Sequence, residues 1–279
     1  MNKVYIKIAL ALLSLVGYME NVAFASEAAT NSVKKSPTLL QNEFEQHIDL
    51  ICDDVNEAIL AVENVNSTSE LLIKLSETSV DGYSTYYTEN ENEIIYSKKI
   101  GNMDIGRLHV TIPSVSKYLD ILRNLWDVNN PQKTDDKIIN GNIVRLYCKF
   151  LVMFEKQNID GENLRSKKRY ALGARFKQSN DKTVIVCPSR NIYYEGTIQQ
   201  ETDLKEIFEN TKSIENDIDA EEALVKLGDN IAGFIIKKGD DDQVHIIYIN
   251  AIYEGENYTS DKKERDATYK NILSLAQRI

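Results

Sequence analysis

The chain has 279 residues, of which 42% are hydrophobic and 27% are charged, and its 43 acidic and 33 basic side chains give a net charge of −10. An acidic chain of this kind lacks the clustered Lys and Arg that nucleic-acid phosphates require, and it does not favour tight docking on anionic membranes. The three cysteines, Cys52, Cys148 and Cys187, are too few and too widely spaced for a disulfide framework or a zinc site. We expect buried free thiols, with one disulfide as the alternative in an oxidising compartment.

The first 25 residues have the pattern of a secretory signal peptide. Two lysines precede a short apolar run at residues 8–16, and Ala23 and Ala25 are small residues at the positions that a signal peptidase reads. The run is too short to span a membrane, and a buried N-terminal helix is the less favoured alternative. We therefore expect cleavage after residue 25, a disordered lead-in at 26–36, and a soluble secreted protein of net charge −10 − 2 + 1 = −11, because two lysines and one glutamate are lost.

Residues 37–76 are predicted to form an N-terminal helical part. Apolar residues recur at helical spacing between residues 40 and 62, and Cys52 lies on this apolar face. The polar segment 64–69 is expected to break the helix, and residues 70–75 offer one or two further turns. An apolar face of this length must be buried, and a sheet formed by the rest of the chain is the available partner.

After residue 82 the apolar period becomes strand-like. Three strands are predicted, followed by a short helix after Ser114 whose apolar face includes Leu119. Asp219, with Glu222 three residues later, is typical of a capping box for a helix through about Ile231, and segment 204–208 is ambiguous between strand and helix. The predicted strands are 83–88, 93–98, 105–112, 142–147, 150–156, 169–177, 182–187, 233–238 and 244–253, before a final helix that reaches Ile279.

No sequence motif indicates catalysis. His47, His109 and His245 are far apart, and none neighbours a nucleophile motif, a phosphate-binding glycine loop or a metalloprotease motif. The acidic run 217–222 lacks the glycine that a calcium loop needs at its sixth position, so helix capping explains it better. We therefore predict a non-enzyme with no catalytic residue, no metal site and no cofactor. Catalysis by a group of residues that no known motif marks stays open as an alternative.

Several strands are apolar on both faces, including residues 183–187 and 245–249. In a single-layer sheet one face would meet water, so this pattern favours a sheet that curls around an apolar interior. Plain structural burial of both faces explains the pattern equally well.

The order of these segments resembles that of START-type lipid-carrier domains. The similarity lies in Trp126-Asp127 after the short helix, in Ser189 at a strand end, and in the AGFIIKK and VHIIYINAIY hairpin. The chain more closely resembles the secreted fam-a family of malaria parasites, which carries such a domain. That resemblance covers the signal segment and the segments LRNLWDVNNPQK, NGNIVRLYCKFLVMF, KKRYALGARF, AGFIIKK and VHIIYI.

The resemblance implies an α+β helix-grip fold over residues 37–279, in which a curved antiparallel sheet wraps around a C-terminal helix and leaves an internal lipid tunnel. Two features depart from the START pattern. Arg169 starts the strand where START sequences carry an Arg–acid pair, and the acid is missing here. Only residues 261–278 are available for the final helix, about 27 Å of length, which is short for a lid that must close a tunnel.

The function implied by the resemblance is binding of a phospholipid, with phosphatidylcholine favoured, and its transfer between membranes through transient membrane contact. The final helix, residues 269–279, would open at a membrane and then close again. Secretion into the parasitophorous vacuole, or export to the host cell, is the implied location. The alternative is a secreted or surface-displayed protein that uses the same shell to bind host-cell factors without lipid transfer, and a lipid-modifying enzyme ranks third.

The candidate lipid-binding residues follow from strand alternation. Ile143, Arg145 and Tyr147 are expected on one side of their strand. If that side faces the interior, Arg145 would bind the lipid phosphate and Tyr147 would flank the quaternary ammonium. A solvent-facing Arg and Tyr is the alternative. Further aromatic candidates, each of which also suits an ordinary core, are Trp126, Tyr170 and Tyr248.

Overall fold

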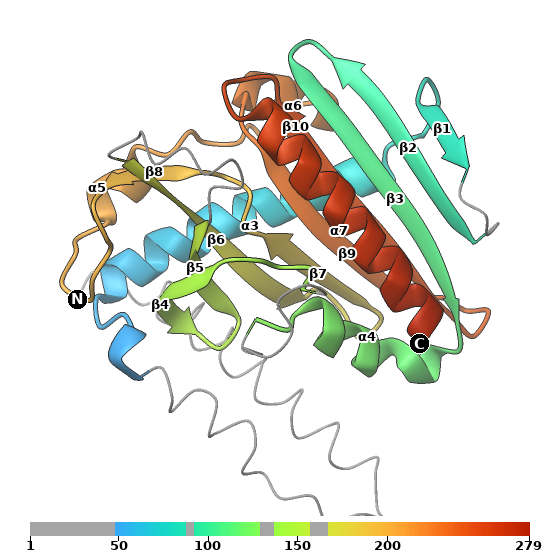
Figure 1. Ribbon diagram of the computed structural model, residues 1–279, viewed down its shortest axis with the longest axis horizontal. Helices are drawn as coiled ribbons and strands as arrows, with labels where there is room; N and C mark the ends of the chain where they lie inside the picture. The colour runs from blue at the N-terminus through green and yellow to red at the C-terminus, as the bar shows by residue number, and fades with distance from the viewer. Residues whose placement is uncertain (1–47, 88–91, 129–136, 157–166) are drawn as a thin grey trace, which may run out of the picture.

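The computed structural model describes residues 48–87, 92–128, 137–156 and 167–279 (Figure 1). The expected signal peptide, the lead-in and the beginning of the predicted N-terminal helix lie outside these residues. Among the described residues, no helix combines the length and the apolar composition needed to cross a bilayer.

The core of the fold is an antiparallel sheet of ten strands in the described part of the chain. Its strand order is β1-β2-β3-β10-β9-β7-β6-β5-β4, and β8 pairs with β6 beside this path. Pairing of β3 with β10 joins the first meander to the last hairpin, so that Leu108 lies opposite Tyr248. The strands are β1 (Ser84–Tyr87), β2 (Glu93–Ile100), β3 (Met103–Pro113), β4 (Asn142–Cys148), β5 (Leu151–Lys156), β6 (Lys167–Lys177), β7 (Lys182–Cys187), β8 (Ile192–Glu195), β9 (Ile231–Lys238) and β10 (Gln243–Tyr253).

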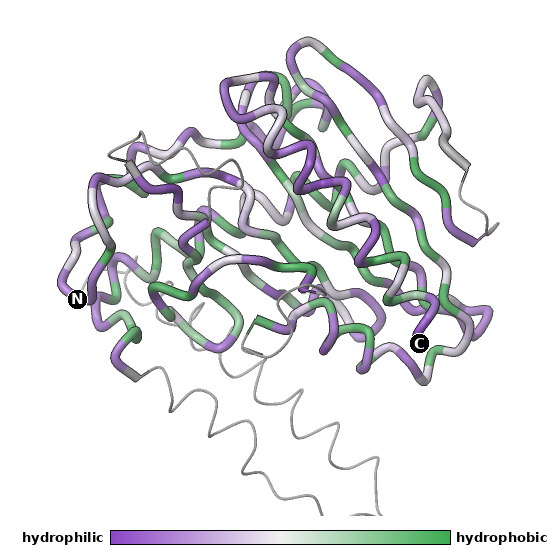
Figure 2. Tube along the Cα trace, in the orientation of Figure 1, coloured by the Kyte–Doolittle hydropathy of each residue, from purple (hydrophilic) through white to green (hydrophobic). Residues whose placement is uncertain are grey.

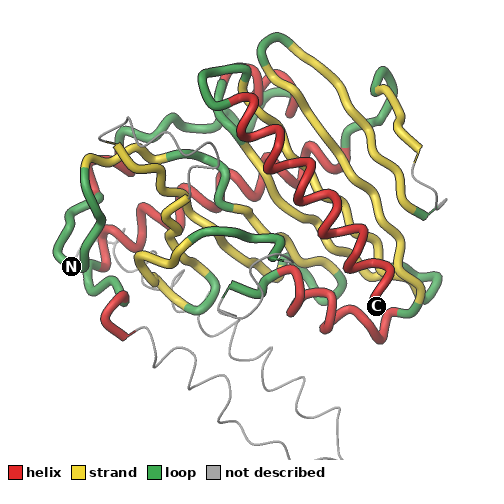
Figure 3. Tube along the Cα trace, in the orientation of Figure 1, coloured by secondary structure: helices red, strands yellow, loops and turns green. Residues whose placement is uncertain are grey.

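Helices cover both faces of this sheet. Figures 1 and 3 show α7 lying across one face and α3 running across the opposite face. This arrangement confirms the α+β helix-grip architecture. The helices are α3 (Val55–Glu77), α4 (Tyr118–Leu125), α5 (Lys205–Glu209), α6 (Ala220–Leu227) and α7 (Tyr258–Arg278), with short 3-10 helices η1 (Ile48–Leu50) and η2 (Val115–Lys117).

Alternation along the strands explains why both sheet faces are apolar. On β10, Ile246 and Tyr248 pack in the core under α4 and α7, whereas Ile249 and Ala251 pack in the core under α3. Figure 2 shows apolar residues along the central strands between the two helical layers. Burial on both faces therefore accounts for the two-sided strands, which was one of the two interpretations left open by the sequence.

Helix α3 differs from its prediction at its beginning and in the middle. It begins at Val55, because the side chain of Asp54 accepts hydrogen bonds from the first-turn amides, so Cys52 precedes the helix. It also continues through residues 64–69, where a break was expected. There the hydroxyls of Ser67 and Thr68 donate to the carbonyl of Asn64, which satisfies these polar groups within the helix.

Four further details depart from the sequence predictions. Strand β8 was not predicted, and Leu119, which was expected on an apolar helix face, is 49% exposed. Segment 204–208, which the sequence left open between strand and helix, contributes to α5. Helix α6 ends at Leu227, because Gly228 adopts a left-handed conformation with φ of 57°, and Ile231, where the helix was expected to end, is the first residue of β9. Helix α7 begins at Tyr258 and has 21 residues, which is about 31 Å of helix and longer than predicted. All three cysteines are free thiols in the structure.

Candidate functional site

The first half of α7 is fixed to the sheet by ion pairs. Arg265 pairs with Asp104 of β3 at 3.1 Å, and both side chains are almost fully buried. Asp261 pairs with Arg169 of β6 at 3.2 Å. The ammonium group of Lys156 on β5 lies 3.0 Å from the carboxylate of Glu264. Asp261, Glu264 and Arg265 occupy helical positions that share one face, so this half of α7 meets the sheet through charged groups.

The second half of α7 meets the sheet through apolar and aromatic side chains. Ile272 and Leu275 are buried in the core that also contains Phe234 and Tyr248. The rings of Phe234 and Tyr248 have centroids 4.6 Å apart, and Tyr269 of α7 packs edge-on against Tyr248 at 5.8 Å. Burial raises the pKa of Tyr248 well above its ordinary value, so its hydroxyl stays protonated.

A small polar cavity lies where the two halves of α7 meet the sheet. It has a volume of about 30 Å³ and is lined by Lys156, Tyr248, Asp261, Glu264 and Thr268, among others. This volume is about that of one water molecule in the liquid. Described side chains therefore fill the layer between α7 and the sheet, where a lipid tunnel was expected.

Arg145 and Tyr147 lie on the opposite side of the sheet, facing α3. Arg145 Nη1 donates to both carboxylate oxygens of Glu57 at 2.6 and 2.8 Å, and the Tyr147 hydroxyl donates to Glu57 at 2.8 Å. Arg145 also donates to the backbone carbonyls of Gln199 and Thr202. Its donors are thus occupied by the protein itself.

The grouping of Ile143 with Arg145 and Tyr147 on one side of β4 was wrong. Ile143 packs with the core on the α7 side, whereas Arg145 faces α3. The pairing of β4 with β5 shifts register between Ile143 and Arg145, and a bulge of this kind changes which face the following residues present.

The other candidates divide between the two faces. Trp126 follows the last turn of α4 and is buried in the same core as Tyr248, on the α7 side. Tyr170 lies in the α3-side core, where its hydroxyl donates to the carbonyl of Gly196 at 3.0 Å. Of the five candidates, Trp126 and Tyr248 therefore lie in the core on the α7 side, whereas Arg145, Tyr147 and Tyr170 lie on the α3 side. Whether any of the five binds lipid stays a prediction.

Sequence reasoning missed the charged residues that hold α7. The acid that seemed to be missing beside Arg169 is supplied by Asp261, 92 residues later in the chain. The spacing of Asp261, Glu264 and Arg265 marks a charged helix face, but their partners on three strands were not visible in the sequence.

No protein-family model matches the chain, and no curated protein matches it either. Among solved structures, 15 chains match. Human StAR-related lipid transfer protein 5 aligns with a TM-score of 0.46 and 8% identity, over 78% of this chain and 97% of that chain. The lipid transfer and protein localization domain of human StarD13 (DLC2) aligns with a TM-score of 0.36 and 10% identity, over 74% of this chain and 95% of that chain. Human STARD10 aligns with a TM-score of 0.35 and 12% identity, over 75% of this chain and 80% of that chain.

Proposed function

We propose that the protein binds one phospholipid between α7 and the sheet, and that it transfers this lipid between membranes. The observation that carries the proposal is the division of α7 into a charged half and an apolar half. The contacts of Ile272 and Leu275 with the sheet are apolar, and acyl chains can replace them without leaving a polar group unpaired. The half that contains Asp261 and Arg265 keeps the helix attached while the other half moves.

The energetic scale is compatible with such an exchange. Each buried methylene contributes about 0.8 kcal/mol, so an acyl chain of about fifteen methylenes offsets the loss of several buried helix side chains, each worth about 1.5–3 kcal/mol. The volume under α7 must then come from displacement of the helix, because the cavity present there has only about 30 Å³.

The head group would occupy the polar end of this layer. A zwitterionic head group such as phosphocholine needs a cation for its phosphate and an anion or aromatic face for its ammonium. Three residues that line the small cavity supply these groups: Lys156 is the cation, Glu264 is the anion and Tyr248 provides the aromatic face. This combination favours phosphatidylcholine over an anionic phospholipid.

Mass spectrometry tests whether a lipid is bound. The purified protein is incubated with phosphatidylcholine vesicles, separated from them and extracted. We expect close to one phosphatidylcholine per protein molecule. Lys156→Gln should lower this content strongly, and the matched control Lys270→Gln, an exposed position on α7, should not.

A vesicle-to-vesicle assay with fluorescent phosphatidylcholine tests the movement of α7. Leu275→Ala weakens the apolar half of the helix and should raise the transfer rate, whereas Leu119→Ala, at an exposed position on α4, should leave it unchanged. Equal rates in the two variants would contradict the proposed opening.

The filled layer under α7 favours a second function, in which the folded shell binds another protein and carries no lipid. A protein that stays lipid-free after incubation, and that transfers no labelled lipid although it is folded, would support this second function over the first.

A further inference from the structure

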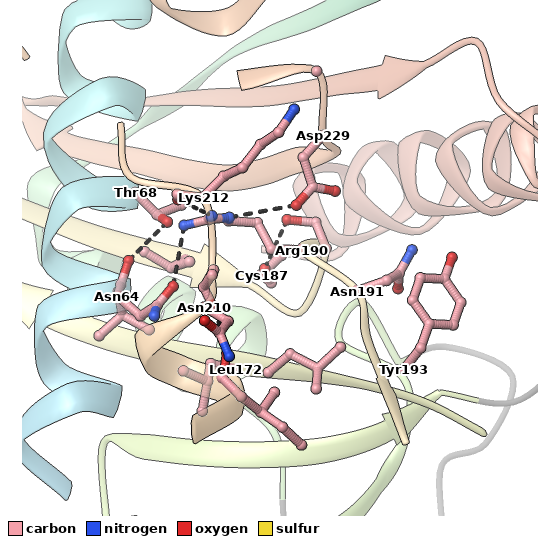
Figure 4. A pocket seen from close by; sticks show the side chains of 17 residues that line it. Asn64, Thr68, Leu172, Cys187, Arg190, Asn191, Tyr193, Asn210, Lys212 and Asp229 are labelled. Carbon is pink, nitrogen blue, oxygen red and sulfur yellow. Dashed lines mark hydrogen bonds and ion pairs between the residues drawn. The ribbon is translucent and has the colours of Figure 1, made fainter. Parts of the chain in front are cut away.

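A larger cavity lies on the other side of the sheet, away from α7. It has a volume of about 370 Å³, is partly open to solvent, and is bordered by α3, by the segment that follows β7, and by the segment that joins α5 to α6 (Figure 4). Ligand pockets in proteins have volumes of about 300–1,000 Å³. A water molecule, which has one non-hydrogen atom, occupies roughly 30 Å³ in the liquid. At that volume per atom, the cavity holds about a dozen non-hydrogen atoms.

One wall of the cavity is apolar. Val65 of α3, Leu172 of β6 and Val186 of β7 are at most 8% exposed and face this space. Ile192 and Ile207 complete the wall from β8 and α5. An apolar chain bound here would be shielded from water on every side that these residues cover.

The opposite wall carries a net positive charge. Among the described residues that line the cavity, Arg190 and Lys212 are cationic and Asp229 is anionic, so the sum is +1 + 1 − 1 = +1. The whole chain, in contrast, has a net charge of −10. The cavity is therefore a locally cationic site on an acidic protein.

Arg190 is held in place by groups that leave its charge incompletely balanced. Its Nη1 donates to Asn64 Oδ1 at 3.1 Å and its Nη2 donates to the carbonyl of Lys212 at 2.7 Å, and both acceptors are neutral (Figure 4). Asp229 approaches Nε only to 3.6 Å. Burial lowers the pKa of Arg190 and raises the pKa of Asp229, and the charge of each residue offsets part of the shift of the other.

Among the described residues, two buried polar atoms at this wall have no partner within hydrogen-bond distance. They are Asn191 Oδ1 and Arg190 Nε, which has only the longer ion-pair contact with Asp229. Buried polar atoms are nearly always hydrogen-bonded in native proteins, so atoms of this kind require an explanation. A half turn of the Asn191 amide would present its NH2 group instead, so Arg190 and Asn191 can both donate to an anion.

We propose that this cavity binds a small single-chain amphipathic anion, with the chain against Val65, Leu172 and Ile207 and the anionic group at Arg190 and Lys212. A carboxylate and a phosphate monoester share this chemistry. The two cavities share Cys187 and Ser189, but Arg190 and Lys212 line only this one, and Lys156 and Glu264 line only the cavity under α7. Variants at these distinct residues therefore test this proposal and the proposed lipid transfer independently.

Calorimetric titration of the purified protein tests the proposal with three probes of equal chain length: decanoate, n-decyl phosphate and decanol. We expect at least one anion to bind at least tenfold more tightly than decanol, because hydrogen bonds to charged groups contribute more than 1.4 kcal/mol. The tighter anion identifies the preferred group. Anions that bind no better than decanol overturn the proposal.

Two variants locate the binding. Lys212→Gln removes one exposed charge and should weaken anion binding about tenfold while decanol binding stays the same. Ile207→Trp fills the apolar wall of the cavity and should abolish binding of all three probes. The matched control is Lys270→Gln on α7, which should bind the probes like the unmodified protein.

Thermal unfolding of each variant shows whether it is folded. If Ile207→Trp does not fold, Lys212→Gln still tests the site. Lys212 is exposed, and within the described part of the chain its side chain donates a hydrogen bond to the carbonyl of Leu227 alone. Folded Ile207→Trp or Lys212→Gln protein that binds the anions with unchanged affinity would place them elsewhere and overturn the assignment.

Discussion

Arg265 of α7 and Asp104 of β3 form a two-pronged buried ion pair across the layer between helix and sheet. Arg265 Nη2 lies 3.1 Å from Asp104 Oδ2, and Nη1 lies 3.2 Å from Oδ1 and 3.1 Å from the backbone carbonyl of Asp104. The Tyr258 hydroxyl donates to the same carboxylate at 2.6 Å. These contacts fix the first half of α7 on the sheet, which is the half that stays attached in the proposed lipid transfer.

Removal of one partner of this pair should destabilise the protein strongly. Asp104→Leu leaves the Arg265 charge buried and unpaired, and we expect the free energy of unfolding to fall by about 3–5 kcal/mol. Urea unfolding measures this change. The double variant Asp104→Leu with Arg265→Met should recover most of the loss, because it leaves no unpaired charge.

Arg123→Ala is the control for that experiment. It removes an ion pair with Asp120 in which both side chains are more than half exposed, so it should change stability little. A loss for Asp104→Leu as small as that for Arg123→Ala would show that the buried pair does not hold α7.

The same pair predicts a loss of stability in acid. Burial tends to raise the pKa of Asp104, but the hydrogen bonds from Arg265 and Tyr258 outweigh it and hold the pKa below its ordinary value of 3.8. A carboxyl with a lowered pKa in the folded state stabilises the protein above the unfolded value, and this contribution disappears as the pH falls through the folded value. Urea unfolding below pH 4 should therefore depend less on pH in the Asp104→Leu, Arg265→Met double variant than in the unmodified protein.

His109 predicts a second pH dependence at higher pH. Burial, with a further effect from the Arg107 charge, lowers the pKa of His109 to about 4, compared with 6.5 for an ordinary histidine. Between these values the unfolded chain binds the proton first, so the free energy of unfolding falls as the pH decreases from 6.5 to 4, by up to about 3 kcal/mol.

His109→Phe tests this prediction. Phe retains an aromatic ring next to Tyr96, whose centroid lies 5.0 Å from that of His109, but it does not titrate. Urea unfolding at pH 7 and pH 5 should show a smaller difference between the two pH values in the variant. An unchanged difference would mean that His109 is not the group responsible.

Gly106 and Tyr269 should be energetically coupled. A Cβ atom at Gly106 would lie 2.1 Å from the Tyr269 hydroxyl oxygen, which is closer than atoms can approach. Gly106→Ala should therefore destabilise the protein by about 1–3 kcal/mol through overpacking. The Tyr269 hydroxyl is buried without a hydrogen-bond partner in the described residues, so Tyr269→Phe alone should cost little.

A double-mutant cycle measured by urea unfolding checks the coupling. In the Tyr269→Phe background, Gly106→Ala should cost less than it does alone, because the clashing oxygen is gone. Additive effects of the two substitutions would contradict the packing of α7 against β3 described above.

Arg145 should affect stability more than lipid content. Its guanidinium is paired with Glu57 at 2.6 Å and both side chains are 2% exposed, so Arg145→Ala should cost about 3–5 kcal/mol. The folded fraction should still bind phosphatidylcholine, since Arg145 lies on the α3 side of the sheet. Loss of lipid from folded Arg145→Ala protein, measured by mass spectrometry, would restore Arg145 as the phosphate partner.

Local sequence patterns predicted the elements of this fold well. Strand-like apolar segments bounded by turn residues identified β2, β3, β6, β7, β9 and β10 to within three residues at each end, and Asp219 was correctly predicted as a helix cap. These features depend on residues close together in the chain, so a single sequence contains the information. The break predicted at residues 64–69 failed because tertiary burial of Val65 and Leu72 outweighs the weak helix propensity of this segment.

What surrounds each candidate residue was decided only by the tertiary structure. A bulge in β4 turned Arg145 away from Ile143 and toward Glu57, 88 residues earlier in the chain. Likewise, Asp104 and Arg265 are separated by 161 residues, and Arg190 meets Asn64 across 126. The sequence by itself determined most of the strands and helices, and it showed that several strands are apolar on both faces. Pairing of distant strands determined which charges meet, because strand register and helix docking depend on contacts that no local pattern encodes.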